Sequence, residues 1–117
     1  MKKVSVATIQ GKWTGDFKSN AAWYREQALS LKGKNVDLVI LPELFHTPYF
    51  PFEENADFFD LAIEKDDNLV REWQEIAREI HAVVVFPFFE KRAKGIYHNS
   101  AFVFERDGSI AGLYRKS

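Results

Sequence analysis

The chain has 117 residues, a length that suits one domain or a part of a larger one. Hydrophobic residues make up 46% of it and charged residues 28%, a balance that is typical of a globular protein and excludes a disordered one. The 16 Lys and Arg residues nearly balance the 17 Asp and Glu residues, so we expect no strongly basic nucleic-acid surface and no polybasic membrane segment.

The sequence also lacks the marks of exported and membrane proteins. No apolar run approaches the roughly 18 residues that span a bilayer, and the first residues lack the apolar core of a secretory leader. We therefore predict a cytoplasmic protein. The absence of cysteine excludes disulfides, thiolate metal ligands and a cysteine nucleophile within these 117 residues.

The chain is predicted to open with a strand and a helix. β-Branched residues over 4–9 predict a strand that is buried on both faces. The helix is predicted to begin near Asp16 or Ser19, either of which suits an N-cap. Basic residues and a glycine over 32–35 predict its end, with Gly33 as the C-cap.

A second buried strand is predicted over residues 36–41, where Pro42 stops it. An aromatic, proline-containing loop follows over 43–51. A short helical turn is predicted within residues 52–63.

The strongest amphipathic pattern follows an N-cap cluster at residues 66–68. It predicts a helix that ends near His81, where an imidazole offsets the helix dipole. The apolar stripe of this helix consists of Leu69, Val70, Trp73, Ile76, Ala77 and Ile80.

Three further strands are predicted, over residues 82–86, 97–104 and 110–114. The step from Asp107 to Gly108 lies between the last two and predicts a hairpin. The whole order predicts an α/β fold, with parallel strands joined by right-handed crossovers and an antiparallel hairpin at the sheet edge. Two helices are few for about five strands, so we expect an incomplete part of a larger fold.

Two charged residues at strand ends are candidates for chemistry. Glu43 follows a buried strand, and the carboxyl ends of parallel strands are where open α/β sheets hold ligands. It suits a general base, or a solvated carboxylate. Lys116 ends the last predicted strand and suits an oxyanion partner, or a surface lysine.

The histidines and glycines argue against a metal site and against a nucleotide-binding loop. The histidines, at positions 46, 81 and 98, lack metal-site spacing, and the glycines form neither GxGxxG nor a P-loop. Asn99 suits a backbone-bonding role in the sheet.

Two segments carry a resemblance when they are considered together: residues 41–44 (Leu-Pro-Glu-Leu) and residues 108–116, which end in Tyr-Arg-Lys. They resemble the amino-terminal half of the nitrilase superfamily, the carbon–nitrogen hydrolases. Residues 4–10 and 99–103 agree with this resemblance. Residues 43–50 are most similar to the branch of N-carbamoylputrescine amidases and N-carbamoyl amino acid amidohydrolases.

The resemblance implies an αββα sandwich, of which this chain is the first, incomplete half, with residues 1–117 forming the N-terminal portion of a single domain. It implies a Glu-Lys-Cys catalytic set that hydrolyses an N-carbamoyl or linear amide substrate. Glu43 would be the general base and Lys116 would stabilise the tetrahedral intermediate. Tyr49 is expected on the wall of the substrate pocket. No metal or organic cofactor is implied.

The missing cysteine is the large departure from the family pattern. The cysteine of the family lies beyond the lysine, so we expect a complementary C-terminal half to carry it, and the chain alone to be inactive. Members of the family usually pair into dimers or larger assemblies, so the resemblance also implies a homo-oligomer. The alternative is a non-catalytic binding or assembly module that kept the fold and lost the nucleophile. A flavodoxin-like ligand domain is disfavoured because the phosphate loop is missing.

Overall fold

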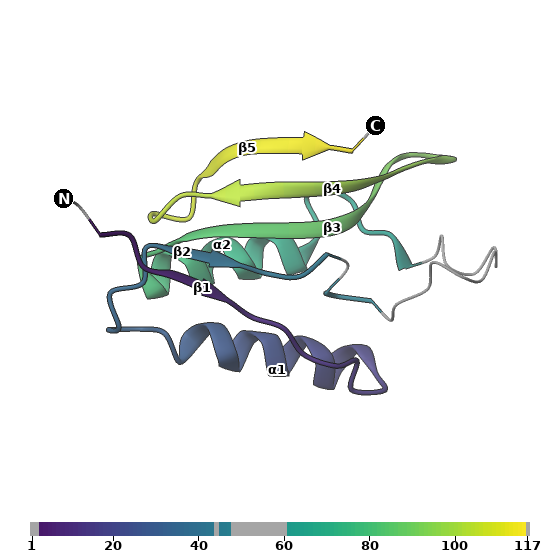
Figure 1. The fold of residues 1–117 in the computed structure, drawn as a ribbon. Coiled ribbons are helices and arrows are strands. Elements are labelled where there is room, and N and C mark those ends of the chain that lie inside the picture. The colour runs from purple at the N-terminus through teal and green to yellow at the C-terminus, as the bar shows by residue number, and fades with distance from the viewer. Residues whose placement is uncertain (1–2, 44, 48–60, 117) are drawn as a thin grey trace.

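The computed structural model describes residues 3–43, 45–47 and 61–116. Within these ranges it contains one five-stranded sheet and two helices (Figure 1). The elements in chain order are β1 (Val6–Thr8), α1 (Phe17–Leu29), β2 (Leu38–Ile40), α2 (Asn68–Ile80), β3 (Val83–Ala93), β4 (Ile96–Phe104) and β5 (Ile110–Arg115).

The sheet is mixed, and its strands lie in the order of the sequence. β1, β2 and β3 run parallel, with Val39 between Ala7 and Val84 in the register. β3, β4 and β5 run antiparallel, with Phe102 between Phe86 and Leu113. The predicted parallel strands and the antiparallel edge hairpin are therefore confirmed. The short helix predicted within 52–63 falls almost wholly outside the described residues.

Aspartate side chains cap both helices at their N-termini. Asp16 accepts a hydrogen bond from the Ser19 N–H at 2.8 Å, and Asp67 accepts one from the Leu69 N–H at 2.9 Å. Of the two predicted N-cap candidates for the first helix, Asp16 and Ser19, the structure thus selects Asp16. The predicted end of the first helix is wrong by several residues, because α1 ends at Leu29 and Gly33 lies in the following turn.

β3 extends seven residues beyond the predicted strand, which was expected to end at Phe86. Pro87 lacks an N–H and argues against a central strand. Here it is tolerated because β2 pairs with β3 only as far as Val85, so Pro87 faces no β2 partner. Beyond Pro87, the Lys91 N–H donates to the Ile63 carbonyl at 2.8 Å, so Ile63 takes the place of a β2 residue beside this part of β3.

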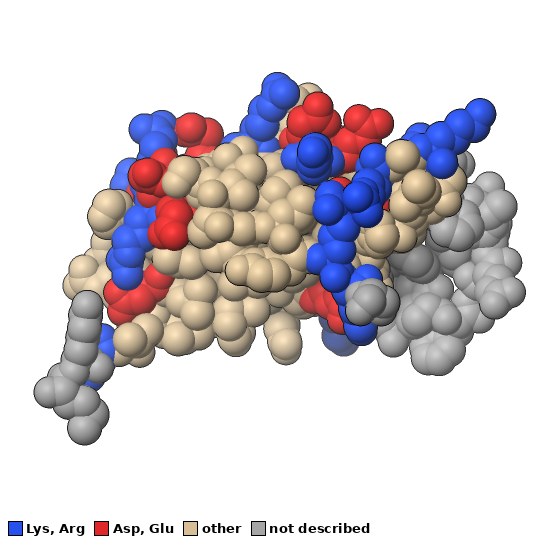
Figure 2. Space-filling view, turned by 90° about the horizontal axis from the view of Figure 1, so that it is seen from above, with Lys and Arg blue, Asp and Glu red and all other residues tan. Residues whose placement is uncertain are grey.

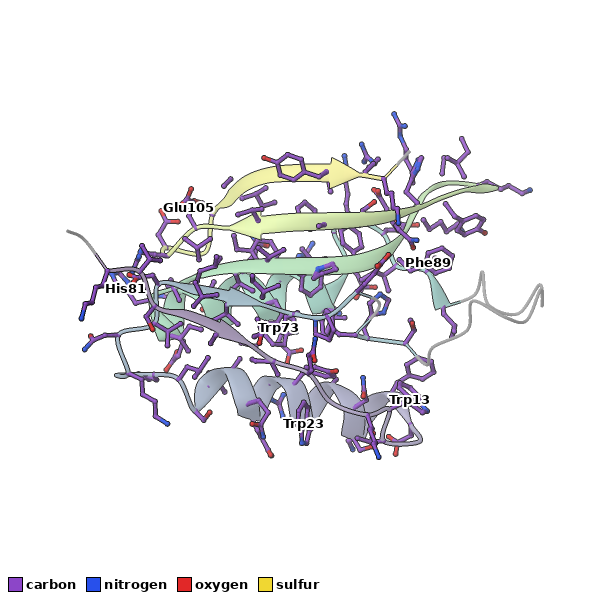
Figure 3. All side chains as sticks on the ribbon, in the orientation of Figure 1. Trp13, Trp23, Trp73, His81, Phe89 and Glu105 are labelled. Carbon is purple, nitrogen blue, oxygen red and sulfur yellow. The ribbon has the colours of Figure 1, made fainter. Side chains whose placement is uncertain are left out.

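Both helices cover the same face of the sheet. α1 lies beside α2, and two exposed ion pairs, Arg25 with Glu72 and Lys32 with Glu79, join them. The core lies between these helices and the sheet, and Figure 3 shows Trp73 beneath the strands. The described residues thus form two layers, one of helices and one of strands.

The opposite face of the sheet, here called the open face, is apolar and partly exposed. Successive side chains of a strand point to opposite faces, so the residues next to each core residue in a strand lie on the open face. Figure 2 shows a broad area without charged side chains between charged groups at its two ends. The residues of the open face include Leu38, Ile40, Val83, Val85, Ala101 and Val103.

The turn between β4 and β5 packs against α2, and this contact predicts a difference between two glycine variants. Gly108 has a φ of 86°, and an added Cβ would lie 2.6 Å from the Gln74 carbonyl oxygen. Gly95 has a similar φ of 78° but no atom within 4 Å of such a Cβ. Gly95→Ala should lower the free energy of unfolding by about 1 kcal/mol through backbone strain. Gly108→Ala should lower it by at least ~2 kcal/mol, because steric overlap is added.

Urea unfolding followed by tryptophan fluorescence measures both variants. Equal losses for Gly95→Ala and Gly108→Ala would contradict the close packing of this turn on α2.

Candidate active site

A cavity of about 400 Å³ brings the two sequence-predicted site residues, Glu43 and Lys116, together. It lies at the end of the sheet toward which β5 runs. In Figure 3, Phe89 marks this end, and His81 and Glu105 mark the opposite end. The remaining lining residues are Pro87, Phe88, Asn99, Ser100, Ala101, Tyr114 and Arg115.

Glu43 emerges just beyond the end of β2. The Leu41 N–H donates to the Val85 carbonyl at 3.2 Å, which keeps the chain beside β3 up to Pro42. A turn then follows, in which the Phe45 N–H donates to the Pro42 carbonyl at 3.2 Å. Glu43 is therefore exposed at the carboxyl end of a parallel strand, as its sequence context predicts.

The turn that carries Glu43 is anchored from beneath. Asn20 of α1 is only 2% exposed, and its Nδ2 donates to the Phe45 carbonyl at 2.7 Å. The Phe45 ring packs edge-on against Tyr24, Trp73 and Phe86, with centroids 5.2 to 5.6 Å apart. Two helices and one strand therefore fix the backbone beside Glu43.

His46 supplies a second anchor. Its Nε2 accepts a hydrogen bond from the Phe89 N–H at 3.0 Å, in the place where a neighbouring strand would offer a carbonyl. Burial lowers the pKa of His46 to about 4, although the charge of Asp67 acts in the opposite direction. The imidazole is thus neutral at pH 7, as an acceptor nitrogen requires. The sequence analysis weighed His46 only as a metal ligand and missed this role.

Lys116 directly follows β5. Its N–H donates to the Asn99 carbonyl at 2.9 Å, so the strand pairing reaches this residue. Successive side chains of a strand alternate between faces, which places Lys116 on the face of Tyr114 and Arg115 on the other. The Lys116 side chain is exposed.

Arg115 binds a buried carboxylate on the helix-covered face. Its Nε and Nη2 donate to the two carboxylate oxygens of Glu90, at 2.7 and 2.9 Å. The Ser100 Oγ donates to Glu90 Oε1 at 2.8 Å. These hydrogen bonds, that of Arg115 foremost, hold the pKa of Glu90 below its ordinary value. The sequence analysis did not single out Glu90.

Glu43 also borders a second, smaller cavity of about 170 Å³, formed with residues of the β1–α1 loop and α1. Gly11 and Tyr24 line it, and the Gly11 N–H donates to the Tyr24 hydroxyl at 3.2 Å. Tyr49, predicted on the pocket wall, lies outside the described residues.

In the part of the chain that the structure describes, no helix is long and apolar enough to cross a membrane. The same part holds no group of three or more histidine and acidic side chains placed to bind a metal ion.

Comparison with known proteins assigns the family. Residues 5–117 match the family described as carbon-nitrogen hydrolase. The chain belongs to this family. Its fold matches the crystal structure of a carbon-nitrogen hydrolase from Helicobacter pylori with a TM-score of 0.86 and 40% identity, over 97% of this chain and 39% of that one. The predicted family and α/β fold class are thus confirmed.

Curated relatives include amidases. The chain is 33% identical over 116 residues to an N-carbamoylputrescine amidase of Oryza sativa subsp. japonica, and covers 38% of its length. It is 29% identical over 118 residues to a citrullinase of Francisella tularensis subsp. tularensis, and covers 41% of its length. These matches take in 98% and 100% of this chain. The chain therefore spans about two fifths of the length of these carbon–nitrogen hydrolase relatives.

The buried imidazole of His46 predicts a loss of stability in acid. The unfolded chain binds a proton below the ordinary pKa of 6.5, whereas the folded chain does so only below about 4. The unfolded state therefore binds more protons between these values, and the free energy of unfolding falls as the pH is lowered through them. The loss from His46 should reach roughly 3 kcal/mol by pH 4.

His46→Gln should remove this part of the pH dependence, because an amide oxygen accepts the Phe89 hydrogen bond without titrating. Urea unfolding of both proteins at pH 7 and at pH 4.5 measures the difference. Equal losses in the wild type and in His46→Gln would show that the imidazole titrates normally in the folded state.

Proposed function

We propose that this chain supplies the general base and the oxyanion-stabilising cation of a carbon–nitrogen hydrolase, and that a cysteine outside these 117 residues is the nucleophile. The observation that carries the proposal is the shared cavity of Glu43 and Lys116. Residues 73 positions apart in the sequence face one hollow, in a chain that belongs to a family of carbon–nitrogen hydrolases.

In the first step, the Glu43 carboxylate takes the thiol proton, and the thiolate attacks the carbonyl carbon of the substrate. The carbonyl oxygen becomes an oxyanion, which the Lys116 ammonium stabilises. The carbon–nitrogen bond then breaks, Glu43 passes the proton to the leaving amine, and a thioester remains on the cysteine.

In the second step, Glu43 takes a proton from water, and the resulting hydroxide attacks the thioester carbon. Collapse of the second tetrahedral intermediate releases the thiolate and the carboxylic or carbamic acid. A carbamic acid decomposes to carbon dioxide and ammonia. No step in this sequence requires a metal or an organic cofactor.

The substrate class that we propose is an N-carbamoyl amine or a linear amide. The names of two relatives, N-carbamoylputrescine amidase and citrullinase, refer to compounds in which a terminal carbamoyl group is attached to nitrogen. Glu43 is exposed at the cavity that it shares with Lys116, so the amide group of a substrate in this cavity could reach its carboxylate.

The open face also supports a partner layer. We propose that residues 1–117 form the N-terminal portion of one domain, and that a second sheet packs on the open face to complete an αββα sandwich. Partly exposed apolar residues such as Val85 and Val103 form a surface that two aligned sheets would bury. The cysteine would lie on this second layer, next to Glu43 and Lys116.

Glu43→Gln should abolish turnover in the polypeptide that also contains the cysteine, because the amide keeps the shape but cannot accept a proton. The loss in kcat should exceed roughly a hundredfold. Lys116→Met, which keeps the stem without the charge, should lower kcat at least tenfold by the loss of oxyanion stabilisation.

Matched controls are Glu105→Gln, which lies at the opposite end of the sheet (Figure 3), and Lys34→Met, which is exposed in the turn after α1. Both should retain kcat. An unchanged kcat with a normal melting curve in either the Glu43 or the Lys116 variant would overturn the role proposed for that residue.

The 117-residue chain on its own should be inactive and should associate. It has no thiol nucleophile, and its open face leaves apolar side chains in contact with water. Gel filtration with light scattering should show species larger than 13.6 kDa. Val103→Lys, which puts a charge on the open face, should raise the share of monomer. A clean wild-type monomer with a cooperative melt would count against the missing second layer.

A further inference from the structure

Glu90 is a buried carboxylate for which the proposed reaction has no use. It is 1% exposed, and it lies on β3, on the helix-covered face. Its oxygens accept hydrogen bonds from Ser100 of β4 and from Arg115 of β5. One carboxylate therefore ties together three neighbouring strands, and its two partners, Ser100 and Arg115, also line the cavity that Glu43 and Lys116 share.

The end of β5 is a place where such a tie matters. β5 is an edge strand, so it has a strand partner on one side, β4. The ends of edge strands open more readily than central strands because fewer contacts hold them. Lys116 directly follows this end, and its backbone N–H donates to the Asn99 carbonyl. Apart from this bond, the position of its ammonium depends on how Arg115, the preceding residue, is held.

Arg115 determines the direction in which Lys116 points. Its guanidinium binds Glu90 through two parallel N–H···O bonds, a geometry that fixes orientation as well as distance. Because neighbouring side chains of a strand point to opposite faces, Arg115 held on the helix-covered face turns Lys116 toward the open face. That is the face on which Glu43 is exposed.

We propose that Glu90 is a positioning residue: through Arg115 and Ser100 it holds the end of β5 so that the Lys116 ammonium stays in the cavity opposite Glu43. This inference rests on the proposed role of Lys116. A buried ion pair is weak evidence for stability in itself, because desolvation offsets the attraction. A role in positioning Lys116 therefore explains the Glu90–Arg115 ion pair better than a contribution to stability does.

A second, more exposed ion pair of the sheet offers a control. Arg106 Nη2 lies 2.8 Å from Asp37 Oδ1, at the opposite end of the same sheet. In the polypeptide that contains the cysteine, Glu90→Gln should lower kcat at least tenfold and change KM by less than threefold. Asp37→Asn should leave kcat within twofold of the wild type, although it also breaks an ion pair of the sheet.

Arg115→Lys keeps the positive charge but cannot form the two parallel hydrogen bonds to Glu90. It replaces Glu90→Gln as the test variant if Glu90→Gln fails to fold. It should show the same loss of kcat with a melting temperature near that of the wild type. Wild-type kcat in a folded Glu90→Gln or Arg115→Lys variant would overturn the proposal.

A double-mutant cycle separates positioning from general destabilisation. If Glu90 acts through Lys116, then Glu90→Gln should cost less than twofold when it is added to Lys116→Met. Single-turnover measurements with excess enzyme keep the slow variants measurable. Losses that multiply would show that Glu90 acts independently of Lys116 and would overturn the inference. Wild-type kcat in Lys116→Met alone would instead reject the proposed function itself.

Discussion

The packing of Phe45 beneath the sheet is the contact on which both the fold and the candidate site depend. Its ring meets Tyr24 of α1, Trp73 of α2 and Phe86 of β3. Edge-on aromatic contacts of this kind add to the burial of apolar area and fix the angles between elements. Because Phe45 lies two residues after Glu43, the same cluster that joins both helices to the sheet also sets where the carboxylate emerges.

The two charged residues of the cavity are held by different physical means. The Glu43 turn rests on apolar packing and on neutral hydrogen bonds from Asn20 and to His46. Lys116 rests on the backbone bond to Asn99 and on an ionised pair that lies behind the sheet. The first support requires an uncharged imidazole and the second requires an ionised carboxylate. Both conditions hold at neutral pH, because the pKa values of His46 and of Glu90 are both lowered.

The elements and the two cavity residues could be predicted because their signals are local. Strand and helix periodicity, the Asp-Gly step and the motifs around Glu43 and Lys116 all lie within short windows of sequence. The supports could not be predicted in the same way, because each joins residues far apart in the chain. Asn20 contacts a residue 25 positions away, and His46 one that is 43 positions away. The extension of β3 was missed for a related reason: Pro87 disfavours a strand unless one knows that β2 has already ended beside it.

The supports of Glu43 and of Lys116 occupy separate stretches of the chain. The contacts described for the Glu43 turn end with Phe89, and those for Lys116 run from Glu90 onward. During synthesis from the N-terminus, the contacts that support the Glu43 turn are thus all present in the chain before β4 and β5 have been translated. The cation arrives later, just after β5, on a hairpin that packs on elements already made: Phe102 and Phe104 join the core, and the turn at Gly108 contacts α2. The base can therefore be in place on the growing chain before the cation, and the cavity is complete only when the last strand has paired with β4.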